Sequence, residues 1–330
     1  MQPINIRRLI LHPGSPKTGT SGIQNALFRA RNSLIEQGFV YPLAGIPTKN
    51  DVARGHHDIA RSIDPSLPSP QGELLRLFEA LRTEIAAYPD HTVILSSEEF
   101  FGVERIRFLL RMLRVDQLTV YVSLRPQHEV INANYYTEVT HNRIVEAPSV
   151  YFDSVIRHMR YLEKLDALIS AGPNTILHLR LFEKGSPSRK GPVADFSSVL
   201  GIRLPADAAN NAVEHPTLPA RPTLFLRWLN EIGFDRQEFF DVFQSLHRMR
   251  PRLPSEIYTM SPARIKAVIE HFRAENQEIR RRFLDGEDAS LFEEPQVPDL
   301  ARWNAEVGED HVKAEREFFI FLLSCAKDVS

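Results

Sequence analysis

Four short apolar segments of this sequence alternate with stretches of helical periodicity, and this alternation constrains the fold more than any other feature. The segments are Arg8–His12, Thr92–Ser97, Leu118–Leu124 and Thr175–Leu179. Each has the length and the apolar character of a buried strand. Because strands separated by helices pair in parallel and are covered on both faces, the sequence predicts an α/β fold with three layers and a central, mostly parallel sheet.

The later part of the chain has a different pattern. From about residue 220 onward the sequence is helical in character, and no internal repeat or linker precedes this part. A chain of 330 residues can form one large domain. We therefore predict a single domain, with an α/β core over residues 1–205 and a helical part over residues 206–330.

The composition argues against several classes of function. The formal net charge of −2 provides no overall field that would attract nucleic acid or an anionic membrane. The single cysteine, Cys325, excludes a disulfide framework and argues against a cysteine-based metal site. No apolar segment is long enough to span a bilayer, and no signal sequence is recognisable. We expect a cytoplasmic protein without a nucleic-acid partner; the sequence does not indicate its oligomeric state.

The segment between the first strand and the first helix, residues 13–22, carries the groups that an anion requires. Its two glycines allow backbone N–H groups to surround a concave space, and the dipole of the following helix adds partial positive charge. Its lysine adds a full charge, and its hydroxyl side chains add hydrogen-bond donors. We predict that this loop binds a phosphate or sulfate group. The residues expected to hold it are Lys17, Thr18, Gly19, Thr20 and Ser21.

The helix that follows the loop has an apolar stripe and a predicted start. Ser21 and Gln24 have the spacing of a capping box, in which the glutamine side chain bonds to the helix's own backbone. Gly38 is positioned to end the helix.

The order of residues in the loop argues against a nucleoside triphosphate. The Walker A motif ends in Gly-Lys-Ser/Thr, whereas here Lys17 precedes Gly19. In addition, no obvious acidic magnesium ligand follows the next strand. A small-molecule kinase of the P-loop class is therefore disfavoured, but it is kept as an alternative.

Residues 9–27, LILHPGSPKTGTSGIQNAL, resemble the 5′-phosphosulfate-binding loop of sulfotransferases, and they are most similar to the bacterial branch whose N-termini read like LHIGTHKTGTTSIQ. Weaker similarities follow in the family's order, at residues 56–60 (HHDIA), 96–100 (SSEEF) and 194–202 (ADFSSVLGI). The resemblance implies a P-loop-type fold whose α/β core binds the nucleotide. It also implies transfer of a sulfuryl group from 3′-phosphoadenosine 5′-phosphosulfate to a hydroxyl or amine, with no metal. The acceptor, a small molecule or a saccharide, stays open.

The resemblance also assigns Arg125, which follows the third predicted strand, to the 3′-phosphate of the donor. Arginine suits this role because its planar fork can bind a phosphate with two hydrogen bonds. Family members add a serine eight residues later, where this chain has Ala133, so Asn132 or Asn134 is the available replacement. An Arg-Lys-Gly triplet at residues 189–191 is similar to one in animal sulfotransferases. Its position differs, and we interpret it as a solvated helix entrance.

Sulfuryl transfer requires a general base for the acceptor hydroxyl and positive charge at the leaving oxygen. Lys17 is the predicted stabiliser of the leaving oxygen. The candidate bases are the pairs His56-His57 and Glu98-Glu99, with His57 preferred and Glu98 second. Surface histidines on a loop, and glutamates favoured by a nearby helix dipole, are the structural alternatives.

Three hypotheses of function follow from the sequence. The first is an active sulfotransferase, and the second is a P-loop small-molecule kinase. The third is a non-catalytic nucleotide-binding homologue with a degenerate donor site, for which Ala133 in place of the family serine is the support.

Overall fold

The computed structural model describes most of the chain. The described residues are 2–47, 54–64, 72–170, 172, 174–183, 185–204, 217–284, 290–292, 297–308 and 318–319. Cys325 and the predicted boundary between residues 205 and 206 lie outside them.

The chain forms two compact units, each built from three segments. The first comprises Met1–Pro126, Tyr161–Val213 and Glu275–Phe292. The second comprises Gln127–Arg160, Glu214–Ala274 and Glu293–Ser330. The first unit contains the sheet and the predicted anion-binding loop, and the second is helical in its described parts.

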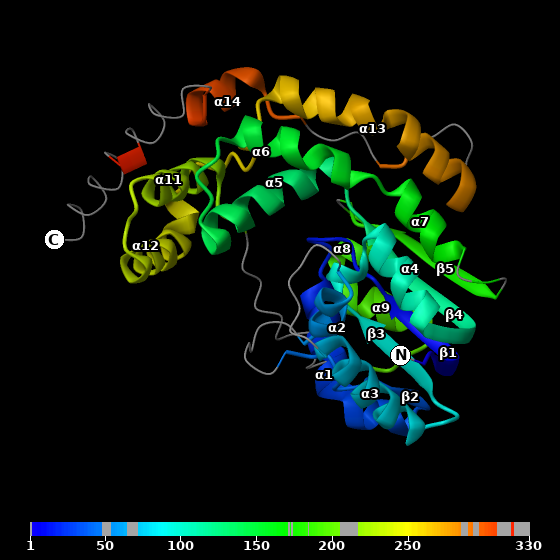
Figure 1. Cartoon of the computed structure of the whole chain (residues 1–330). Helices are drawn as coiled ribbons and strands as arrows, with labels where there is room; N and C mark the ends of the chain where they lie inside the picture. The colour runs from blue at the N-terminus through cyan, green and yellow to red at the C-terminus, as the bar shows by residue number, and fades with distance from the viewer. Residues whose placement is uncertain are drawn as a thin grey trace. The chain divides into compact units, whose positions relative to one another are not determined.

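The sheet of the first unit is entirely parallel in its described strands, with the order β2-β3-β1-β4-β5 (Figure 1). The strands are β1 (Ile4–His12), β2 (Phe39–Val40), β3 (Thr92–Ser96), β4 (Leu113–Leu124) and β5 (Thr175–Leu181). In the register of the sheet, Leu11 of β1 pairs with Leu95 of β3 and with Val120 of β4. The predicted parallel α/β architecture is therefore confirmed.

Helices cover both faces of this sheet. Alternate residues of each strand point to opposite faces, so that Leu9 and Leu11 join one apolar cluster while Ile10 joins the other. The first cluster includes buried residues of α2 (His57–Ser62), α3 (Glu73–Ala86), α4 (Val103–Met112) and α7 (Leu162–Ile169). The second includes those of α1 (Thr20–Glu36) and α9 (Pro192–Leu200). The predicted three-layer arrangement is confirmed.

The second unit has its own apolar core, in which Tyr135, Phe152, Phe225 and Phe272 are almost fully buried. Its helices are α5 (Gln127–Thr137), the π-helical turn η2 (Glu138–Asn142), α6 (Pro148–Val155), the 3₁₀ turn η3 (Ile156–Met159), α11 (Ala220–Glu231), α12 (Arg236–Met249), the 3₁₀ turn η4 (Arg250–Arg252) and α14 (Leu300–Glu306). The boundary between the units falls within α13 (Pro262–Phe283).

Residues 148–169 do not form one continuous helix, and a glutamate of α13 explains the new start at α7. Glu275 Oε1 accepts hydrogen bonds from the N–H groups of Tyr161 and Leu162, at 2.7 and 2.8 Å. These are among the groups that a helix N-terminus leaves without an intrahelical partner, and a carboxylate also complements the helix dipole. The C-terminal part of α13 therefore fixes the beginning of α7 within the first unit.

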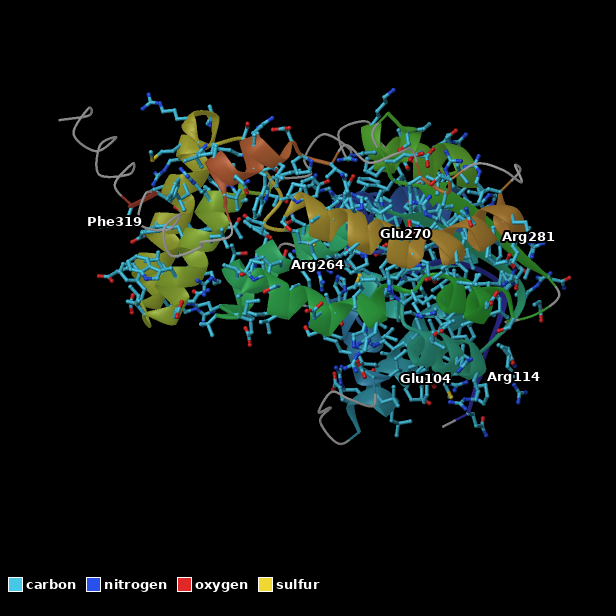
Figure 2. The ribbon with its side chains drawn as sticks, turned by 90° about the horizontal axis from the view of Figure 1, so that it is seen from above. Glu104, Arg114, Arg264, Glu270, Arg281 and Phe319 are labelled. Atoms are coloured by element: carbon cyan, nitrogen blue, oxygen red, sulfur yellow. The ribbon has the colours of Figure 1, made fainter. Side chains whose placement is uncertain are left out.

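We predict that Glu275→Ala lowers the free energy of unfolding by about 1 kcal/mol, because it removes the acceptor for two N–H groups at a helix start. The matched control is Glu270→Ala on the same helix, which Figure 2 labels together with Arg281. Glu270 is exposed and pairs with Arg273, and an exposed pair contributes at most about 0.5 kcal/mol. Denaturant unfolding measures both variants, and equal losses would contradict the capping role.

Candidate functional site

The loop between β1 and α1 has an unusual backbone. Gly14, Lys17 and Gly19 all have positive φ, of 48°, 63° and 78°. The two glycines are also closely packed. A Cβ on Gly14 would lie 2.5 Å from Thr20 Cγ2, and a Cβ on Gly19 would lie 2.6 Å from Pro192 Cγ. Left-handed residues in a turn allow successive N–H groups to face one anion, which is what a phosphate-binding loop requires.

The side chains of the loop divide into two kinds. Thr18 is buried, and its hydroxyl donates to the Ser15 carbonyl at 2.7 Å, so this hydroxyl shapes the loop. Lys17 and Ser21 are exposed. Lys17 adopts the left-handed conformation without being a glycine, which costs about 1–2 kcal/mol. The neighbouring residues of the loop therefore hold the backbone of Lys17 in a conformation that is unfavourable for a lysine, with its charged side chain exposed.

The start of α1 differs from the prediction. Gly19 is the N-cap residue, and no side chain caps this helix end. The capping box predicted from Ser21 and Gln24 is thus wrong: the Gln24 side chain donates to Glu98 Oε2 at 3.0 Å instead. The spacing of Ser21 and Gln24 in the sequence is the same whether Gln24 caps the helix or bonds to Glu98. Only the contact with Glu98 in the folded chain distinguishes the two arrangements. An end without a side-chain cap leaves the positive pole of α1 available to an anion.

Arg125 reaches the loop from the end of β4. Its Nη1 donates to the Lys17 carbonyl at 3.0 Å, and its guanidinium lies 6.0 Å from the centre of the Phe182 ring. The guanidinium of Arg189 lies 5.8 Å from the same ring. Arg189, which we interpreted as part of a solvated helix entrance, is half-buried and contacts this ring. Two arginines share one aromatic ring at the carboxyl edge of the sheet, beside β1 and its loop.

The two adjacent histidines differ in their hydrogen bonds. His56 uses both ring nitrogens on the backbone: Nδ1 accepts from the Ser96 N–H at 3.1 Å, and Nε2 donates to the Pro42 carbonyl at 3.0 Å. Burial lowers the pKa of His56 to about 4. His56 is therefore a neutral histidine that joins loop and strand, and its nitrogens are not available for proton transfer.

His57 has one ring nitrogen engaged and one without a partner. Its Nδ1 lies 2.9 Å from Ser97 Oγ, while its Nε2 has no hydrogen-bond partner and lies 4.0 Å from Glu98 Oε2. The residue is 3% exposed. A gap of 4.0 Å is too long for a direct hydrogen bond, but one small polar group can bridge it.

The two candidate glutamates also have different surroundings. Glu99 forms an ion pair with Arg61, in which Oε1 accepts from Nε at 2.9 Å and from Nη2 at 2.7 Å, and Oε2 accepts from Nε at 3.1 Å. Glu98 receives the Gln24 amide and adjoins the loop, because a Cβ on Gly14 would lie 3.4 Å from Glu98 Cα. The Glu98 side chain is 30% exposed. Glu98 is thus the carboxylate beside the predicted anion-binding loop, and Glu99 is held by an arginine.

Asn132, one of the two residues suggested as a replacement for the family serine, already uses its side-chain amide in hydrogen bonds. Asn132 donates from Nδ2 to the Ile257 carbonyl at 2.8 Å, and its Oδ1 accepts from the N–H and the hydroxyl of Thr259. These bonds lie within the second unit, so the amide of Asn132 has a structural role there. Ala133 is buried beside it on α5.

The described parts of the chain contain neither a metal-binding cluster nor a membrane-spanning helix. Among those residues, no group of three or more His, Cys, Asp or Glu side chains could hold a metal ion. Nor is any helix in those parts long and apolar enough to cross a membrane.

Comparisons with known proteins give matches among solved structures. No family model matches the chain. The search of curated proteins gave no match either. A sulfotransferase from Alicyclobacillus acidocaldarius is 16% identical, with 71% of this chain and 98% of that chain covered and a TM-score of 0.39.

Two crystal structures of retinol dehydratase are each 14% identical to this chain. The complex with retinol and PAP covers 65% of both chains, with a TM-score of 0.29. The complex with androsterone and inactive cofactor PAP covers 73% of this chain and 70% of that chain, with a TM-score of 0.31. The function proposed below rests on the chain's own residues.

The close packing of Gly19 gives a test of the loop geometry. Gly19→Ala adds left-handed strain and a contact with Pro192, so it should cost at least about 1 kcal/mol more than strain alone. Gly38→Ala is the matched control, because Gly38 has a φ of 82° and nothing near its Cβ position. Equal losses in chemical unfolding would show that the loop does not pack against Pro192 as described.

Proposed function

We propose that this chain is a sulfotransferase, which transfers the sulfuryl group of 3′-phosphoadenosine 5′-phosphosulfate to a hydroxyl or amine of a small-molecule or saccharide acceptor. The observation that carries the proposal is the loop after β1. Three of its residues have left-handed backbone conformations, and no side chain caps the helix that follows. The Lys17 carbonyl in this loop accepts a hydrogen bond from Arg125. The resemblance of residues 9–27 to the 5′-phosphosulfate loop supports the same donor.

The donor's two anionic ends would be bound by different groups. The 5′-phosphosulfate would be held by Lys17, Thr18, Gly19, Thr20 and Ser21, with Thr18 acting through its N–H because its hydroxyl is engaged. The 3′-phosphate would be held by Arg125 together with Arg189, which flank Phe182. Arg189 supplies a second cation in a chain that has Ala133 where the family has a serine.

The transfer forms a bond between the acceptor oxygen or nitrogen and sulfur, and it breaks the bond from sulfur to the phosphate oxygen. Lys17 would stabilise the charge that develops on that phosphate oxygen. A base takes the acceptor's proton, and we assign this role to Glu98. Its partial exposure and its place beside Gly14 support it, whereas the Nε2 atom of His57 is buried. This assignment reverses the order proposed from the sequence, in which His57 was the preferred base and Glu98 the second. His57 then lies beside the base.

The donor is tested by calorimetric binding of adenosine 3′,5′-bisphosphate, the expected product, against ATP with magnesium. We expect the bisphosphate to bind with a Kd on the order of 1 µM, independently of magnesium, and Lys17→Ala to abolish this binding. Binding of ATP with magnesium alone would favour the kinase hypothesis. Binding of neither nucleotide would favour a non-catalytic homologue with a degenerate donor site.

The role of Arg189 is tested by the preference for the bisphosphate over adenosine 5′-monophosphate. Loss of a charge-assisted hydrogen bond costs about 1.5–3 kcal/mol, so Arg189→Gln should reduce bisphosphate affinity by at least about tenfold and leave monophosphate affinity unchanged. Lys190→Gln, at the exposed neighbouring position, is the charge-matched control. An equal effect of both substitutions would contradict a specific contact with the 3′-phosphate.

A further inference from the structure

Gln24 is a buried polar residue on the inner face of α1, which is apolar in its later buried positions, from Ala26 to Leu34. It is 0% exposed, and the buried residues around it on the helix include Ile23 and Leu27. Its Nε2 donates to Glu98 Oε2 at 3.0 Å. Because a carboxylate can only accept, the amide group must present Nε2 to Glu98 and direct Oε1 elsewhere.

Two buried atoms beside Glu98 have no hydrogen-bond partner. They are Gln24 Oε1 and His57 Nε2. Burial of an unsatisfied polar atom costs about 1–3 kcal/mol, so such atoms are rare and call for an explanation other than folding stability. Both belong to residues that adjoin the same carboxylate, from two different helices. Two such costs therefore fall on residues that contact Glu98.

Gly55 makes this arrangement compact. A Cβ on Gly55 would lie 2.7 Å from Gln24 Cδ and 2.9 Å from His57 Nε2. Only a residue without a side chain lets the backbone pass so close to both groups. The chain before α2 is therefore fitted to Gln24 and His57 together.

A purely structural role does not account for Gln24. An apolar side chain of similar length, such as methionine, would fill the same space without leaving an unsatisfied oxygen, and it would suit the apolar face of α1. What methionine cannot supply is the N–H that meets Glu98. The amide therefore acts on the carboxylate.

We propose that Gln24 is a positioning residue that orients Glu98 for the transfer reaction, with His57 Nε2 near the same carboxylate oxygen, Oε2. This inference rests on the proposed function. The Gln24 N–H occupies Oε2, which leaves the second oxygen of Glu98 to take the acceptor's proton as the new bond to sulfur forms. The broken bond leaves its electron pair on the phosphate oxygen, at the loop. Gly55 keeps Gln24 and His57 close to each other.

The test separates turnover from donor affinity. Gln24→Met removes the amide and keeps the volume, and a misplaced catalytic group can cost about a hundredfold in rate. We expect release of the bisphosphate from the donor, with water as the acceptor at saturating donor, to fall by at least about tenfold. Affinity for the bisphosphate, measured by calorimetry, should stay within about twofold. Gly55→Ala, which displaces both neighbours of Glu98, should give the same split.

The matched control is Gln37→Met at the other end of α1. The Gln37 amide bonds to the backbone of Ser33 and Arg203, so this variant should lower the melting temperature and leave turnover unchanged. A second measurement needs no turnover: in bisphosphate-loaded protein, Gln24→Met should shift the ¹⁵N resonance of His57 Nε2, and Gln37→Met should not.

The outcomes separate the two proposals. Wild-type protein that binds no bisphosphate overturns the proposed function and this inference with it. Wild-type protein that binds and turns over, with Gln24→Met within about twofold in rate, overturns the inference alone. A rate loss that only parallels a loss of donor affinity overturns it too. If wild-type turnover is too slow to follow, an unchanged His57 resonance in Gln24→Met overturns the inference, and a shifted one supports it.

Discussion

The parallel pairing of β1 with a neighbour on each side is the constraint on which the candidate site depends. His12 of β1 pairs with Ser96 of β3, and Leu11 pairs with Val120 of β4, so the strands end at the same edge. Parallel sheets bind ligands at this edge because every strand delivers its following loop there. The predicted anion-binding loop, Glu98 and Arg125 follow these three strands. Their proximity is a consequence of the register.

Strands with a continuous apolar run were predictable, and strands without one were not. β2 has two residues, Phe39 and Val40, which is too short for any periodicity. β4 begins at Leu113, five residues before the predicted start, and its first part includes the exposed residues Arg114 and Gln117. These residues pair with β1 through backbone hydrogen bonds, which side-chain hydropathy does not report.

The candidate site was predictable where its geometry is local. The loop after β1 depends on glycines at set positions, and a sequence motif records them directly. The roles of single side chains depend on distant partners instead. His56 is held by Pro42 and Ser96, which no spacing within residues 56–60 reveals. Likewise, the role of Arg189 depends on its contact with the Phe182 ring, and that of Gln24 depends on its hydrogen bond to Glu98.

The charges at the sheet edge are divided by β1. On the side of β4 and β5 lie the guanidinium groups of Arg125 and Arg189, and on the side of β3 lies the carboxylate of Glu98. Because Arg61 neutralises Glu99, Glu98 is the acidic group that matters there. An in-line transfer needs positive charge behind the leaving oxygen and a proton acceptor behind the attacking group. In the proposed transfer, Lys17 on the loop after β1 would meet the first need and Glu98 the second, while Arg125 and Arg189 lie on the far side of β1 from Glu98.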